Sequence, residues 1–330
     1  DDIETLRRLA RDGAPGAALA ALDSTPGILY QVQQPVGARF PGNADFVGEN
    51  PPYGATLSFW VNDAQLPHPD PERERARLAA VKPPAGEEGK DSDKPKPLRV
   101  EIRDSAGKLV RHAEVEVKQG LNRWTWDLAH TAPRTPAPPG PFDPAGPAAL
   151  PGSYTATLRR GGARATLPVE VQADPREPAD AAGLAAQQAA ALRAAGLQDR
   201  IVDALERIAN AQAALAQKKS LLEQQIAARK RADPTVEIGD EDAQQKSLKA
   251  IGEASKKLDE AALGLWQDPK KVKGYTAPTA AWDKLSEAQW MLGGSTRAPT
   301  PAALTYLERA AEIVEQKIAA ADAAVAAGAP

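Results

Sequence analysis

The stretch from Leu98 to Leu128 alternates apolar and polar residues with a period of two, and this pattern constrains the fold more than any other. Val100 and Ile102 alternate with charged neighbours, and a turn-like segment rich in Asp, Ser and Gly follows them. Trp124 and Trp126 then lie on one strand face together with Leu128. Such alternation is typical of antiparallel strands with one buried face. It predicts a β-sandwich over residues 29–175.

Beyond Asp174-Pro175 the composition changes to Ala, Gln, Leu, Lys and Glu, and apolar residues recur at intervals of four and three. This spacing is typical of helices that bury one face. Gln212 and Lys219 interrupt the first apolar stripe, a shorter helix is expected around Leu285, and Thr300-Pro301 is a helix start. The three stripes are Ile201 to Ile226, Leu248 to Leu265 and Leu304 to Val325. They predict an antiparallel three- to four-helix bundle over residues 176–330.

Three other segments complete the predicted organisation. Residues 1–28 read as an N-terminal helix and a connector, because apolar residues at helical spacing follow two aspartates. Residues 67–97 are rich in Pro, Glu, Lys and Arg, so we expect a disordered charged insertion that holds one exposed helix. A hairpin is expected to turn at Gly161-Gly162.

Composition excludes several classes of function. The net charge of −3 gives no basic footprint for a nucleic acid and no polybasic signal for a membrane surface. The chain has no cysteine, which excludes disulfides and thiolate metal sites. No apolar run approaches the ~18 residues of a membrane-spanning helix. The chain begins at Asp1 without a methionine or a signal peptide, which suggests a processed or excised piece of a longer protein.

The segment GENPPYG, residues 48–54, is the main candidate for a binding loop, with Glu49, Asn50 and Tyr53 as its polar groups. The alternative is structural, because a residue before proline is restricted to extended backbone and such a loop fixes the entry into the next strand. Trp60 is expected on the strand face opposite Phe59. With Tyr53 it forms a candidate platform for a sugar ring, whereas packing is the ordinary role of a tryptophan.

No catalytic constellation emerges from the spacing of the ionisable residues. Paired carboxylates are what glycoside hydrolysis requires, and nothing brings two of the candidates Asp45, Glu49, Asp104 and Asp127 together. Asp104 is expected to cap its own turn. His68, His112 and His130 do not form a zinc motif, and no phosphate-binding loop is present. We therefore assign no catalytic residue, no metal and no cofactor.

An ordered series of motifs resembles a known family: GENPPYGATLSFWV, LRVEIRDSAGKLVR, GLNRWTWDL, PGSYTATL and VQADPR. It resembles the C-terminal region of exported bacterial proteins that carry a sortilin-like β-propeller of neuraminidase-type repeats and are often labelled glycosyl hydrolase-like. The resemblance covers nearly the whole chain. It implies an immunoglobulin-like sandwich followed by the helical bundle, and an extracytoplasmic (periplasmic or secreted) location. The charged insertion and the segment between Gly13 and Ile28 depart from the family pattern.

Three functions follow as expectations. The first is a non-catalytic interaction module that packs against a β-propeller or another envelope protein subunit. The second is part of a glycoside hydrolase whose active site lies mainly in a propeller outside this chain, with Glu49 or Asp45 reaching it. The third is a carbohydrate-binding module that uses Trp60 and Tyr53.

Overall fold

A computed structural model describes residues 2–30, 52–80, 96–137, 146–177, 180–235, 239, 242–268, 270, 279–293 and 297–328. The chain divides into two compact units. The β unit comprises residues 1–131 and 145–185, and the helical unit comprises residues 132–144 and 186–330. Each unit has its own apolar core.

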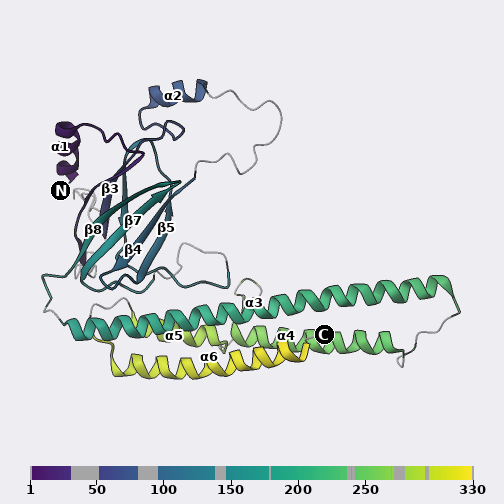
Figure 1. The fold of residues 1–330 in the computed structure, drawn as a ribbon. Coiled ribbons are helices and arrows are strands. Elements are labelled where there is room, and N and C mark those ends of the chain that lie inside the picture. The colour runs from purple at the N-terminus through teal and green to yellow at the C-terminus, as the bar shows by residue number, and fades with distance from the viewer. Residues whose placement is uncertain are drawn as a thin grey trace, which may run out of the picture. The chain divides into compact units, whose positions relative to one another are not determined.

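The strands of the β unit form two sheets (Figure 1). Among the described residues, a three-stranded sheet has the order β1-β3-β6, and a five-stranded sheet has the order β2-β8-β7-β4-β5. The strands are β1 (Leu19–Ser24), β2 (Gly27–Leu29), β3 (Ala55–Val61), β4 (Leu98–Asp104), β5 (Leu109–Val115), β6 (Gly120–Trp126), β7 (Gly152–Arg160) and β8 (Ala163–Ala173).

The period-two pattern places the predicted residues in the core. Val100 and Ile102 of β4 are buried, as are Trp126 of β6 and Leu128 just after it. Trp124 is partly buried against the same core. The predicted hairpin is confirmed, because β7 and β8 pair antiparallel on either side of Gly161-Gly162. Residues from both sheets share this one core, so burial of one face of each strand stabilises the unit.

The prediction of an immunoglobulin-like antiparallel β-sandwich is nevertheless wrong. The five-stranded sheet is mixed, because β2 pairs with β8 in the parallel direction, with Gly27 opposite Val171. The sequence around residues 27–29 is too short to show a strand period, and β1 was not predicted at all. β1 pairs with β3 through an irregularity between Ala21 and Asp23. The period-two pattern predicted the main strands, but it did not predict whether neighbouring strands pair in the parallel or the antiparallel direction.

Among its described residues, the β unit has two short helices. The predicted N-terminal helix is α1 (Asp2–Asp12). The exposed helix expected within the charged segment is α2 (Pro71–Ala80), which has no buried residue. Glu74 of α2 accepts a hydrogen bond from the backbone N–H of His68 at 2.7 Å and pairs with Arg77 at 2.6 Å. These contacts hold the pKa of Glu74 down at about 2, with the Arg77 hydrogen bond as the largest cause.

In the described part of the helical unit there are one very long helix, whose first residues to Ala185 fall in the β unit, and three shorter ones: α3 (Ala181–Ala232), α4 (Ala243–Leu265), α5 (Ala281–Leu292) and α6 (Pro301–Gly328). Ile201, Leu258 and Val314 are among the residues of its core. The predicted start of α6 is confirmed, because the Thr300 hydroxyl accepts the backbone N–H of Ala303 at 3.1 Å.

The helical unit is not the regular antiparallel three- to four-helix bundle that was predicted, because α3 has 52 residues whereas α4, α5 and α6 have 23, 12 and 28, so each shorter helix covers only a part of α3. Within this unit α6 runs parallel to α3. Three ion pairs join them: Arg193 with Glu308, Arg200 with Glu315, and Arg207 with Asp322. On both helices the paired residues advance by seven in the same sense, which only parallel helices allow. By contrast, α4 is antiparallel to α3, since Gln212 meets Asp259 and the later Arg229 meets the earlier Asp242. The apolar stripes predict which faces are buried but not how far each helix extends.

Candidate functional site

Two of the four predicted binding residues, Tyr53 and Trp60, are described by the structure. Glu49 and Asn50 lie outside the described residues. Tyr53 is half-buried, and its ring meets that of Tyr30 edge-on with the ring centroids 5.0 Å apart. Trp60 lies five residues beyond the start of β3, a separation of ~17 Å along a strand. Tyr53 and Trp60 thus lie near opposite ends of β3, and the sugar platform stays a prediction.

Gly54, the last residue of the predicted binding loop, has a structural role. Its φ of +132° is accessible only to glycine in practice, and a Cβ there would lie 2.0 Å from the carbonyl oxygen of Trp126. The glycine thus allows the backbone before β3 to approach β6 closely. This supports the structural interpretation of the loop at this position.

The ring of Tyr30 connects Tyr53 to a charged pair after β8. The Arg176 guanidinium lies 5.5 Å from the centroid of the Tyr30 ring and pairs with Asp174 at 2.7 Å. The hydrogen bond from Arg176 holds the pKa of Asp174 below its usual value. Burial raises the pKa of the Tyr53 hydroxyl. The carboxylate of Asp174 and the guanidinium of Arg176 pair with each other. This pairing favours a structural role for the cluster at the end of the sheet.

The candidate acids and histidines are dispersed. Asp104 accepts the backbone N–H groups of Ala106 and Lys108 at 3.0 and 2.9 Å, which confirms its role as a turn cap. Asp127 lies 3.5 Å from the guanidinium of Arg111. Asp45 lies outside the described residues. His112 contacts the Thr131 hydroxyl. In the part of the chain that the structure describes, no group of three metal-ligating side chains is found.

Large apolar side chains are exposed on both units, and the most exposed of them among the described residues belongs to the helical unit. Trp290 of α5 is 81% exposed, although the opposite face of the same helix is buried through Leu285, Ala288 and Leu292. Leu221 of α3 is 59% exposed. An exposed tryptophan on an otherwise well-packed helix is the kind of side chain that dominates protein–protein interfaces. These side chains make the surface of the helical unit the candidate functional site.

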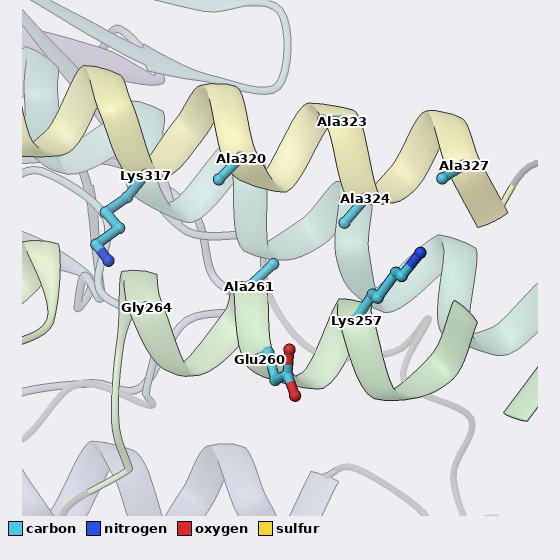
Figure 2. A pocket seen from close by; sticks show the side chains of 9 residues that line it. All are labelled: Lys257, Glu260, Ala261, Gly264, Lys317, Ala320, Ala323, Ala324 and Ala327. Carbon is cyan, nitrogen blue, oxygen red and sulfur yellow. The ribbon is translucent and has the colours of Figure 1, made fainter. Parts of the chain in front are cut away.

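An open groove of about 450 Å³ lies between α4 and α6 (Figure 2). Its walls are mainly small residues, among them Ala261 and Gly264 of α4 and Ala320 and Ala324 of α6. Lys257 and Lys317 extend their ammonium groups along it. Small side chains at a helix contact let the two backbones approach closely. The groove follows this contact between α4 and α6.

Sequence reasoning missed the charged surface of α3. Arg134 donates its backbone N–H to Asp199 at 2.8 Å, pairs with Glu206 at 3.2 Å and also pairs with Asp203. In the sequence Arg134 lies in a proline-rich loop, and nothing in that loop indicates that it contacts a helix. The seven-residue spacing of Arg193, Arg200 and Arg207 was a usable signal, because acids at the same spacing recur in α6.

Comparisons of the chain with protein-family models, with curated proteins and with solved structures find no match. The fold contradicts the immunoglobulin-like part of the sequence resemblance, and no finding supports its sortilin-like or export labels. Among the described helices, none combines the length and apolar character needed to cross a membrane.

Proposed function

We propose that the chain is a non-catalytic interaction module whose helical unit docks on another protein. The exposure of Trp290 carries this proposal. Leaving a tryptophan in water forgoes the ~1.5–3 kcal/mol that burial of a large apolar side chain provides. On α5 the neighbouring core positions are filled by the unit's own residues, so Trp290 is available to a partner.

The class of partner stays a prediction of the sequence resemblance. That resemblance points to a β-propeller domain or another envelope protein subunit, in an extracytoplasmic location. What supports docking in general is the exposed aromatic side chain, because tryptophan is the residue most enriched among those that dominate binding energy.

Site-specific photo-crosslinking in the source cells tests the proposal. A photoreactive amino acid at position 290 should give one defined cross-linked partner. The same group at position 256 should not, since Lys256 is equally exposed on α4 and its side chain is polar. Trp290→Ala should reduce co-purification of that partner by about tenfold, corresponding to ~1.4 kcal/mol. An intact complex with Trp290→Ala, or turnover of a glycan by the purified chain, would contradict the proposal.

A further inference from the structure

Two buried glutamines of α3 hold α5, the helix that carries Trp290. Gln187 is buried, and its Nε2 donates a hydrogen bond to the carbonyl oxygen of Leu292 at 2.9 Å. Gln198 is 1% exposed, and its Oε1 accepts a hydrogen bond from Gln289 Nε2 at 2.8 Å. One amide thus binds the end of α5, and the other binds the residue next to the exposed tryptophan.

α5 depends on contacts of this kind because it is short. It has 12 residues, and a helix of that length is marginal in water without tertiary contacts. Its apolar face packs in the core through Leu285, Ala288 and Leu292. A buried hydrogen bond adds direction to this packing, because a rotation of the helix would leave polar atoms unsatisfied. The two glutamines therefore help to fix the direction in which Trp290 points.

The amide of Gln198 also binds a second element, the proline-rich segment 132–137. Its Nε2 donates a hydrogen bond to the carbonyl oxygen of Arg134 at 3.0 Å. A glutamine amide has its donor and its acceptor on different atoms of one plane, so the two bonds together fix its orientation. Loss of one bond leaves the amide free to turn away from the other partner. Gln198 thus links the proline-rich segment to α5.

Charged contacts hold Arg134 on α3. Its guanidinium pairs with Asp203 and, at 3.2 Å, with Glu206, while its backbone N–H donates to Asp199 at 2.8 Å. These acids follow one another at intervals of four and three, so they lie on one helix face. The arginine side chain is 47% exposed, and ion pairs in water are weakened by salt. The buried bond of Gln198 to this segment therefore depends on a surface contact that ions weaken.

From these contacts we propose that Gln198 is a positioning residue that couples the Arg134 segment to α5 and so regulates the docking site at Trp290. While Arg134 lies on its three acids, the amide is held in the orientation that also binds Gln289. When the arginine leaves, α5 is held less firmly. Partner affinity then falls, because binding must also order α5. This inference rests on the proposed function in taking Trp290 as the docking residue.

Hydrogen exchange of the α5 amides in the intact chain, followed by mass spectrometry, tests the coupling without any partner. Arg134→Ala should speed exchange by about threefold, and Gln198→Leu by about tenfold, because the second variant also removes the direct bond to α5. Arg207→Ala is the matched control. Arg207 is an arginine of nearly equal exposure that pairs with Asp322 of α6, and its loss should leave α5 exchange unchanged.

Further comparisons distinguish coupling from a general loss of stability. In a Gln198→Leu background, Arg134→Ala should have little further effect on α5, whereas two independent losses would multiply. Arg134→Lys keeps the positive charge on the acids and should restore most of the protection. A rise in sodium chloride concentration should speed α5 exchange in the unaltered chain but not in Gln198→Leu, which retains the same ion pairs between α3 and α6.

The outcomes separate this inference from the proposed function. Exchange of α5 that Arg134→Ala leaves unchanged, or effects that multiply in the double variant, overturns the coupling. A position-290 cross-link whose yield does not fall with Arg134→Ala overturns the regulation. Absence of any cross-linked partner at position 290 in the unaltered chain contradicts the proposed function, whereas the exchange experiment needs no partner and decides the coupling by itself.

Discussion

Two sections of α3 show what a third helix adds to the same sequence pattern. The covered section, residues 193–215, lies along α6, whereas the distal arm, residues 216–232 together with residues 242–253 of α4, lies beyond Gly328 of α6. Both sections carry apolar residues at intervals of four and three. In the covered section Ile201 and Ile208 are fully buried, whereas in the arm Leu222 and Ile226 are only half-buried. The periodic stripe therefore specifies a face, and burial of that face depends on how many helices share it.

Truncation of one leucine in each section tests this difference most strongly. Leu258 is 0% exposed at the level where α4 meets α6. Leu258→Ala should lower the free energy of unfolding by ~2–5 kcal/mol, because it removes buried contacts and leaves a cavity. Leu222→Ala should cost ~1 kcal/mol, since part of its side chain is already in water. Urea unfolding followed by circular dichroism at 222 nm measures both, and equal losses would contradict the comparison.

Amide hydrogen exchange should show the same boundary without any mutation. Amides near Leu222 should exchange at least about tenfold faster than those near Ile201, a difference of ~1.4 kcal/mol in opening free energy. The reason is that the arm opens by breaking contacts between two helices, whereas the covered section is also held by α6. Uniform protection along α3 would show that the hairpin is rigid without a third helix.

The sequence predicted what depends on local pattern and missed what depends on distant partners. The strands around Val100 and Trp126, the hairpin at Gly161-Gly162 and the Thr300 cap are each encoded within a few residues, and each was found. β1 and the parallel pairing of β2 depend on strands far along the chain, so no local period reports them. The arm escaped notice for a related reason. Its stripe is as regular as the covered one, and only the position of α6 in the structure distinguishes the two sections.

The ion pairs between α3 and α6 give a test of how the two helices are aligned, with a smaller expected effect. Arg200→Glu should destabilise the helical unit, and adding Glu315→Arg should restore most of the loss, because the pair is re-formed with reversed charges. A surface pair of this kind contributes ~0.2–1 kcal/mol. A double-mutant cycle in urea isolates the coupling. Coupling of Arg200 to Asp322 in place of Glu315 would mean that α6 is shifted by one heptad along α3.

Acid pH should loosen the tip of the arm while the covered section stays folded. Hydrogen bonds from Arg229 and then from the Gln244 backbone hold the pKa of Asp242 below 3.8, the ordinary value for aspartate. The ionised carboxylate therefore stabilises the start of α4 fully above that pH, and its contribution is lost as the pH falls through the lowered pKa. Protection of the first α4 amides should drop there, as measured by hydrogen exchange corrected for intrinsic rates. Asp242→Asn keeps a side-chain cap without the charge, so its protection should be weaker at neutral pH and nearly independent of pH. An unchanged acid response in that variant would assign the loosening to other carboxylates, such as Glu315 on α6, and would remove the distinction between the two sections.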